Sequence, residues 1–248
     1  MDATHEATGK TVYIKEVGTG SEELRIAELL MEKEWVSDPR NHCVPVTKLF
    51  KDHQNAGVSY IVMPFLRPVD SPPFEYVKEI IEFTDQILEV AVDRFPNPVA
   101  DLNFLRVWYF SMRKGWHTGT IYFPGPVSWV TSIHSDCVQA NLMMDADRMY
   151  PEGFHPVRIH HTPDRSDFAE HTSRSAGTVK YYFIDFGISV YIPENLRPKL
   201  VTGALGRDQD PPELSEQVPY DPFKLDIFII GNMFKRDFYK VRPSTCPG

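Results

Sequence analysis

Three groups of residues, far apart in the chain, have side chains and spacings suited to chemistry on phosphate groups. In chain order they are residues 134–141, with the pattern H-x-D-x4-N, residues 185–187, which read D-F-G, and residues 211–213, which read P-P-E and precede Asp226 in the pattern D-x4-G. A lysine, Lys15, comes before all of them. Oxygen-bearing side chains can hold the hard cation Mg²⁺ and a lysine can neutralise phosphate charge, so residues of these types could do chemistry on phosphate groups.

Hydrophobic periodicity predicts the elements that must position Lys15. Alternating apolar and polar residues predict strands over residues 10–17, 44–50 and 58–65. An N-cap serine, Ser21, followed by apolar residues at helical spacing, predicts a helix over residues 21–33. Lys15 therefore lies on a strand that leads into a helix beginning with two glutamates.

Further along the chain, the predicted elements place Asn141 of the first group and Asp185 of the second group beside strands. Helices are predicted over residues 74–92 and 223–234, short strands over residues 141–145 and 179–184, and loops over residues 68–73 and 193–222. Asn141 then begins one strand, and Asp185 directly follows the next one. Both side chains are expected at strand ends, where loops commonly carry functional residues.

In this order the motifs resemble those of a protein kinase. The chain has V-Y-I-K at residues 12–15 for the kinase lysine motif V-A-I-K, and its other groups match the catalytic loop, the D-F-G and the A-P-E. Four sequence segments are closer still to a family of kinase-like proteins abundant in mushroom-forming fungi. They read NHCVPV, NLMMDADRMYPEGFHPV, KYYFIDFGISVY and YDPFKLDIFIIGNMF. The resemblance covers about residues 10–92 and 133–239.

This resemblance implies a role for each matching residue in ATP-dependent phosphorylation of protein serine or threonine. Asp136 would act as the base on the hydroxyl nucleophile, and Asn141 and Asp185 would hold Mg²⁺. Lys15 would contact the α- and β-phosphates of ATP. A helix glutamate would hold that lysine, and its helical phase favours Glu23 over the alternatives Glu22 and Glu28.

The remaining implied roles concern the adenine pocket and the scaffold. Met63 would border the adenine, with Phe65 and Leu66 in the hinge, while Glu213 and Asp226 would be structural anchors. The implied fold is α+β, a two-lobed protein kinase-like fold. Its reduced small lobe, residues 1–66, would hold a β-sheet with one helix. Its large lobe, residues 67–248, would be mainly helical and truncated at the C-terminus, with irregular insertions at 91–132 and 146–178.

Three departures from the kinase pattern favour a second hypothesis, a pseudokinase or remnant that acts as a non-catalytic interaction module. No G-x-G-x-x-G occurs, although a glycine-rich loop normally covers the phosphates. Ser135 stands where the catalytic loop usually has arginine. Val138 stands where a lysine commonly steadies the transferred phosphate. Binding of Mg·ATP is the property that separates the two hypotheses.

Composition excludes several other classes of protein. The 248 residues are 42% hydrophobic and 24% charged, as in an ordinary globular chain, and the net charge of −8 argues against a nucleic-acid binder. The apolar runs are too short for a membrane span, and the N-terminus lacks a signal-peptide pattern. Three separated cysteines predict neither disulfides nor a zinc site. A protein substrate or partner in the cytoplasm or nucleus is the expectation.

Overall fold

The computed structural model describes residues 1–39, 41–93, 131–133, 136–177, 179–192 and 198–238. These residues belong to two compact units. Unit 1 comprises Met1–Val90 and Gln139–Ser189, and unit 2 comprises Ala91–Val138 and Val190–Gly248. The predicted boundary between residues 66 and 67 stays a prediction, and most of the predicted insertion at 91–132 lies outside the described residues.

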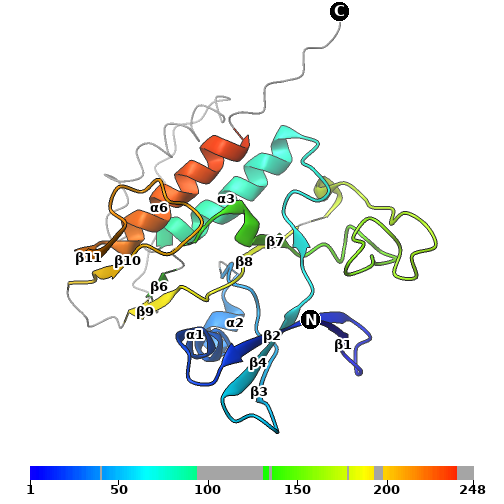
Figure 1. The fold of residues 1–248 in the computed structure, drawn as a ribbon. Helices are drawn as coiled ribbons and strands as arrows, with labels where there is room; N and C mark the ends of the chain where they lie inside the picture. Colours follow the sequence, from blue (N-terminus) through cyan, green and yellow to red (C-terminus); the bar gives the residue numbers. More distant parts are fainter. Residues whose placement is uncertain (40, 94–130, 134–135, 178, 193–197, 239–248) are drawn as a thin grey trace, which may run out of the picture. The chain divides into compact units, whose positions relative to one another are not determined.

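Unit 1 begins with a four-stranded antiparallel sheet in the order β1-β2-β4-β3 (Figure 1). Its strands are β1 (Asp2–Thr4), β2 (Thr11–Gly18), β3 (Lys48–Lys51) and β4 (Val58–Pro64). Strands β2 and β4 pair along their whole lengths, with Lys15 opposite Ile61. Because Ile61 is buried and Lys15 half-buried, this register holds the lysine at the edge of the apolar core.

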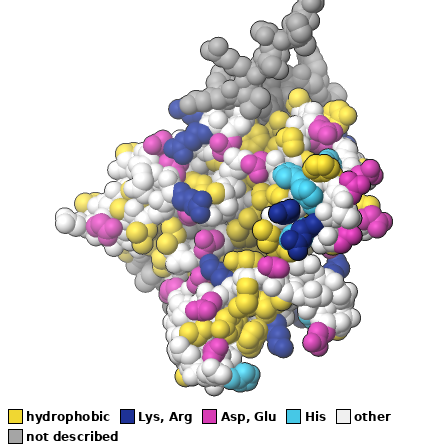
Figure 2. Space-filling view, turned by 45° about the vertical axis from the view of Figure 1, so that its right-hand side comes forward, with side chains coloured by type: hydrophobic (Ala, Val, Ile, Leu, Met, Phe, Trp, Pro, Cys, Tyr) yellow, Lys and Arg dark blue, Asp and Glu magenta, His cyan; other side chains and the backbone are white. Residues whose placement is uncertain are grey.

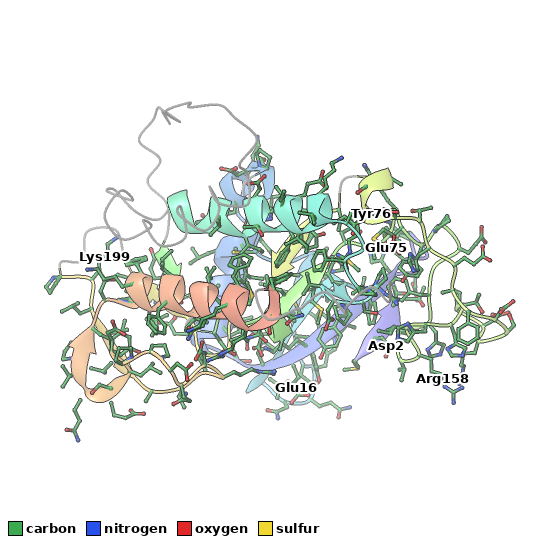
Figure 3. The ribbon with its side chains drawn as sticks, turned by 90° about the horizontal axis from the view of Figure 1, so that it is seen from above. Asp2, Glu16, Glu75, Tyr76, Arg158 and Lys199 are labelled. Atoms are coloured by element: carbon green, nitrogen blue, oxygen red, sulfur yellow. The ribbon has the colours of Figure 1, made fainter. Side chains whose placement is uncertain are left out.

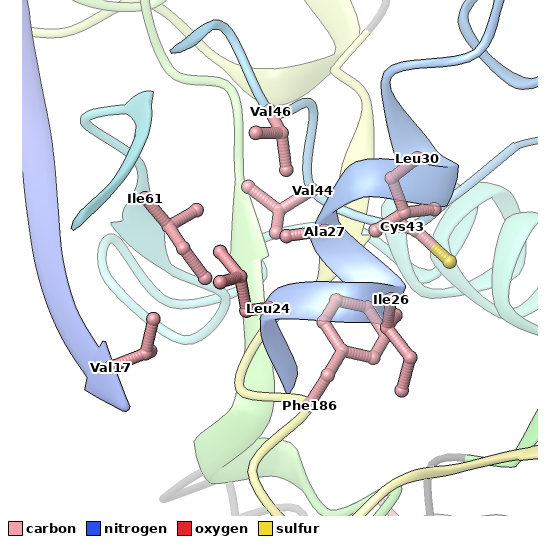
Figure 4. Packing of buried hydrophobic residues seen from close by; sticks show 10 residues of the cluster. All are labelled: Val17, Leu24, Ile26, Ala27, Leu30, Cys43, Val44, Val46, Ile61 and Phe186. Carbon is pink, nitrogen blue, oxygen red and sulfur yellow. The ribbon is translucent and has the colours of Figure 1, made fainter. Parts of the chain in front are cut away.

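Helix α1 (Glu22–Leu30) closes this core. The hydroxyl of Ser21 accepts a hydrogen bond from Leu24 N at 3.2 Å and caps the helix. The buried face of α1 packs into a cluster with residues of β2, β4 and the segments before β3 and after β8 (Figure 4). Its members are Val17, Leu24, Ile26, Ala27, Leu30, Cys43, Val44, Val46, Ile61 and Phe186. Burial of each larger side chain contributes about 1.5–3 kcal/mol, so this cluster fixes α1 against the sheet. A short helix, α2 (Lys33–Ser37), follows.

A second sheet of unit 1 has the order β5-β7-β8 and positions Asn141 and the D-F-G residues 185–187. It contains β5 (Arg67–Pro68), β7 (Leu142–Met144) and β8 (Tyr181–Phe183). Helix α3 (Val77–Asp93) contacts this sheet through Phe83, which is fully buried and meets Tyr181 edge-on at 5.0 Å. This aromatic contact packs the helix against the sheet, as is typical of a protein core.

A buried carboxylate, Glu79, lies in the first turn of helix α3. Its Oε2 accepts the backbone N–H groups of Glu75 and Tyr76, which lie at the start of the helix (Figure 3), and its Oε1 accepts the Ser173 hydroxyl. Burial disfavours the charge, but these hydrogen bonds outweigh it and lower the pKa of Glu79. The helix start is therefore tied to the distant residue Ser173.

Two buried arginines attach the long segment between β7 and β8. Arg67 donates to Ser71 O at 2.7 Å and to Ile159 O at 2.5 Å, and its guanidinium lies 4.3 Å from the ring of Tyr150. Arg174 donates to the carbonyl oxygens of Val69 and Pro72. Although residues 146–177 contain little regular structure, these contacts hold them against β5 and the chain that follows it.

Unit 2 is built from two small sheets and one apolar helix. Strands β6 (Thr131–Ile133) and β9 (Val190–Ile192) form one antiparallel pair, and β10 (Val201–Gly203) and β11 (Ser215–Tyr220) form the other. Helix α6 (Pro222–Met233) continues into a π-helical turn at Phe234–Phe238. Asp221 caps α6 by accepting from Phe223 N at 3.0 Å. Phe223 packs with Ile192 and Val201, so the helix and both sheets share one apolar contact.

The predicted fold class, a two-lobed kinase-like fold with a mainly helical large lobe, is wrong. The described chain is rich in antiparallel sheet and 26% helical. Its described residues between 139 and 220 form strands of three to six residues and two 3-10 helices of three residues. Short apolar runs separated by proline and glycine can pair as strands, but they lack the 3.6-residue stripe that a buried helix needs.

Candidate functional site

Lys15 lies between two carboxylates in unit 1. Its Nζ is 2.5 Å from Glu23 Oε1 and 2.7 Å from Asp185 Oδ1. Strand β2 supplies the lysine, the first turn of α1 supplies Glu23, and the segment after β8 supplies Asp185. Three residues that are far apart in the sequence therefore form one charged cluster, which we call the Lys15 cluster.

Glu23 is the glutamate that pairs with Lys15 among the three that the sequence leaves open. Glu22 is 3.7 Å from Arg25 on the exposed side of α1, and Glu28 is also exposed. Glu23 stands one residue before the buried Leu24, and its side chain is only 14% exposed. Its helical phase turns it toward the sheet, as the sequence analysis predicts. Its role in nucleotide binding stays a prediction.

The environment of Lys15 favours its charged form. Burial disfavours the charge, but the hydrogen bonds to Asp185 and Glu23, together with their negative charges, outweigh it and raise the pKa of Lys15. The lysine side chain is 27% exposed, so a ligand from solvent can still reach it. A charged lysine at a partly open position can bind phosphate oxygens.

Asp185 has an unusual backbone conformation. Its φ is +64°, in the left-handed region that aspartate tolerates better than most residues. Such conformations are often retained at binding sites. At Gly187 a Cβ atom would lie 3.2 Å from Asp185 Oδ1 and 3.7 Å from Glu23 Oε2. The glycine therefore leaves room for both carboxylates beside Lys15.

Asn141 and Asp185 lie at the same end of the β7–β8 hairpin. Leu142 is paired with Phe183, and Ile184 N donates to Asn141 O at 3.0 Å. Asn141 thus lies directly before β7, and Asp185 lies two residues after β8. The Asn141 side chain is buried, at 2% exposure, whereas the Asp185 side chain is 47% exposed.

The oxygen donors at this hairpin end suit Mg²⁺. Mg²⁺ is bound in nucleotide sites by one or two protein oxygens, while phosphates and water complete the coordination. Asp185 supplies a carboxylate, and the buried Asn141 supplies an amide at the same end of the hairpin, where its backbone carbonyl accepts from Ile184 N. Within the described ranges, no group of three or more His, Cys, Asp or Glu could hold a metal ion by itself. The residues therefore fit a metal that arrives with a phosphate ligand.

The residues predicted for the adenine pocket contribute to packing. Met63 on β4 and Leu66 after it are half-buried and pack against the hydrophobic cluster that contains the buried face of α1. Phe65 is half-buried too, and its ring lies 6.1 Å from that of Phe154 in the long segment between β7 and β8. Contact of these three side chains with adenine stays a prediction.

Asp136 belongs to unit 2, where it is buried at 7% exposure. Its Oδ1 accepts the backbone N–H of Arg207 at 2.8 Å, and its Oδ2 lies 3.8 Å from Arg207 Nε. His134 and Ser135, the preceding residues of the motif, lie outside the described residues. Asp136 therefore has a fixed carboxylate in unit 2, and its role as a base stays a prediction.

Besides Glu79, the sequence analysis misses a second buried carboxylate, Asp208. Its side chain is 1% exposed and accepts from Asn232 Nδ2 at 3.0 Å and from an Arg236 guanidinium nitrogen at 2.9 Å. Glu213, the predicted anchor of this segment, is exposed, while the other predicted anchor, Asp226, is buried on α6. Asp208 is in no motif, and only its position just before the P-P-E group could have drawn attention to it.

The surface and the comparisons with known proteins add little to the site. Basic and acidic side chains are interspersed on the face shown in Figure 2. Among the described residues, no helix has both the length and the apolar character needed to cross a membrane. Protein-family models give no match to the chain, and neither do curated proteins. The proposals below therefore depend on the residues themselves.

Proposed function

We propose that the chain binds Mg·ATP through the Lys15 cluster and transfers its γ-phosphoryl group to a serine or threonine hydroxyl of a protein. The observation that carries this proposal is the position of Lys15 Nζ, 2.5 Å from Glu23 and 2.7 Å from Asp185. A lysine held in this way can bind phosphate oxygens, and the Asp185 carboxylate can bind a metal ion in place of the lysine.

Each residue has one task in this proposal. Lys15 binds the α- and β-phosphates, with Glu23 orienting its ammonium group. Asp185 and Asn141 are the oxygen ligands available to Mg²⁺, which when bound neutralises phosphate charge. Asp136 accepts the proton of the attacking hydroxyl. The last assignment is based on the H-x-D-x4-N pattern and its resemblance to the kinase catalytic loop.

Thermal unfolding in the presence of Mg·ATP tests the binding step. A ligand that binds only the folded chain at about 100 times its Kd stabilises it by about 2.7 kcal/mol. We expect the stabilisation in the wild type and its loss in Asp185→Asn, since asparagine also tolerates a positive φ but lacks the charge. Asp147→Asn is the matched control, because Asp147 also pairs with a lysine, Lys10, at 2.6 Å. Equal stabilisation of all three proteins would refute the proposed site.

Transfer is tested separately, with ³²P from γ-labelled ATP and a generic protein substrate. We expect Asp136→Asn to abolish labelling while Mg·ATP still raises the melting temperature.

The second candidate, a non-catalytic interaction module, is favoured by Ser135 and Val138, which stand where the kinase catalytic loop has an arginine and a lysine. This hypothesis predicts that the wild type does not label protein from ATP, whether or not Mg·ATP raises its melting temperature.

A further inference from the structure

A short segment of unit 1, residues 42–46, lies between helix α1 and strand β8. Cys43 forms a parallel bridge with Phe183. On either side of this bridge, Phe183 N donates to His42 O at 2.7 Å and Val44 N donates to Phe183 O at 2.9 Å. The buried apolar side chains of the segment belong to the hydrophobic cluster that contains the buried face of α1 (Figure 4). The segment therefore joins α1 to β8.

The side chain of His42 adds a buried hydrogen bond to this link. Its Nδ1 lies 2.8 Å from Tyr181 O, and because a carbonyl oxygen only accepts, the ring nitrogen is the donor. His42 is 3% exposed and Tyr181 is 2% exposed, so water does not readily replace the ring. Loss of a buried donor leaves its acceptor to bear the cost of desolvation. His42 thus binds β8 at two positions, through its side chain and through its main chain.

Gln86 of helix α3 binds the same strand from another side. Its Oε1 accepts from Tyr181 N at 3.1 Å, and its Nε2 donates to Val179 O at 2.9 Å. Gln86 and His42 therefore bind the N–H and the carbonyl of one residue, Tyr181. His42 belongs to the segment that packs on α1, whereas Gln86 belongs to α3. This difference provides a control for any general loosening of β8.

The Lys15 cluster requires a fixed distance between α1 and β8. Lys15 Nζ lies 2.5 Å from Glu23 Oε1 and 2.7 Å from Asp185 Oδ1. The first carboxylate is in the first turn of α1, and the second lies two residues after β8. A displacement of β8 away from α1 by about 1 Å would take the contact with Asp185 beyond the range of a hydrogen bond.

We infer that His42 is a positioning residue of the Lys15 cluster. By binding β8 at Tyr181 O, it holds the strand against the segment that packs on α1, so that both carboxylates reach the lysine. This inference deepens the proposed function, and its consequence for Mg·ATP binding rests on that function. Its consequence for the two ion pairs does not, because they are formed by side chains of the chain itself.

Three substitutions separate this role from a general loss of stability. His42→Leu removes the donor and keeps an apolar side chain at the buried position. His42→Asn keeps a donor, because the amide nitrogen of asparagine is as many bonds from the main chain as the ring Nδ1. Gln86→Leu removes the two hydrogen bonds from α3 but leaves the link to α1. If His42→Leu does not fold, His42→Gln takes its place, since it moves the donor by only one bond.

A double-mutant cycle in urea unfolding tests the effect on the ion pairs. Lys15→Met is introduced into the wild type and into each of the three variants, and independent sites give additive losses of stability. We expect the loss caused by Lys15→Met to be smaller in His42→Leu than in the wild type, because the ion pair with Asp185 is already weakened. It should be unchanged in His42→Asn and Gln86→Leu. An equal loss in all four proteins would show that His42 only stabilises the fold, and would refute the inference.

Calorimetric titration with Mg·ATP, at a temperature at which every variant is folded, tests the effect on binding. Loss of a buried hydrogen bond shifts a conformational equilibrium by about 10-fold, and the apparent Kd rises by the factor by which the competent arrangement is depleted. We therefore expect Kd to rise by about 10-fold in His42→Leu and to stay near the wild-type value in His42→Asn and Gln86→Leu.

The outcomes of the titration distinguish this inference from the proposed function. If the wild type binds Mg·ATP and His42→Leu binds it equally well, the inference is wrong while the proposed function stands. A rise of Kd in Gln86→Leu as large as in His42→Leu would also contradict the inference. If the wild type does not bind Mg·ATP, the proposed function is wrong, and the double-mutant cycle alone decides whether His42 positions the ion pairs.

Discussion

Replacing Lys15 by methionine tests whether its two ion pairs stabilise the fold. Methionine keeps a long unbranched side chain on β2 but removes the charge between Glu23 and Asp185. The two carboxylates would then lie near one another without the lysine, since both approach Gly187. Like charges at this separation repel, and Glu23 can move only a little because its neighbour Leu24 is buried in the core. We therefore expect the substitution to destabilise unit 1.

The exposure of the three side chains sets the size of the effect. Exposed ion pairs contribute about 0.2–1 kcal/mol, whereas removing one partner of a buried pair costs about 3–5 kcal/mol. Lys15 and Glu23 are 27% and 14% exposed, but Asp185 is 47% exposed, so solvent screens the second pair. The expected loss lies between the two limits, at about 2 kcal/mol, which lowers the melting temperature by about 4–8 °C.

Thermal and urea unfolding measure this loss against a matched control. Lys10 forms an ion pair of similar length with Asp147, at 2.6 Å, but the two side chains are 69% and 57% exposed. Lys10→Met should therefore cost well under 1 kcal/mol. If Lys15→Met unfolds no more easily than Lys10→Met, the Lys15 cluster does not stabilise the fold, and the reasoning from its burial is refuted.

Three further predictions concern the scaffold. Asp221→Ala should cost about 1 kcal/mol in urea unfolding, because it removes the cap of α6, and Asp221→Asn should cost much less. Burial opposes the charge on Asp208, but its hydrogen bonds from Asp210 N, Asn232 and Arg236 lower its pKa below 3.8. Its stabilisation should then be complete above pH 3.8 and be lost below it, so Asp208→Asn and wild type should differ in urea midpoint at pH 6 and converge at the acid end. Phe83→Ala should cost about 3–5 kcal/mol, because the ring is fully buried against Tyr181, and a cost below 1 kcal/mol would contradict this packing.

Much of the Lys15 cluster could be predicted from local sequence. Alternation over residues 10–17 gives β2, and Ser21 with its apolar stripe gives α1, so the phase of Glu23 follows. The strand ends at Asn141 and Asp185 are likewise readable from short apolar runs. These features depend on neighbours within one turn or one strand, which is the range over which periodicity is informative.

The parts that could not be predicted depend on long-range pairing. Strands β5, β10 and β11 arise in segments whose composition predicts loops, and they exist because distant partners satisfy their backbone groups. Asp208 is buried only because Asn232 and Arg236 reach it from another element. The helical large lobe was inferred from resemblance alone, with no 3.6-residue pattern in residues 139–220 to support it.

The way in which Arg67 and Arg174 hold the long segment between β7 and β8 has a consequence for its evolution. Their guanidinium groups donate to carbonyl oxygens of the main chain, at Ser71 and Ile159 for Arg67 and at Val69 for Arg174. Every amino acid has a carbonyl, so substitutions at the accepting positions leave the acceptor in place. Such a loop can change in sequence and acquire new surface properties while Arg67 binds it at Ile159 O and Arg174, within the loop, binds the chain after β5.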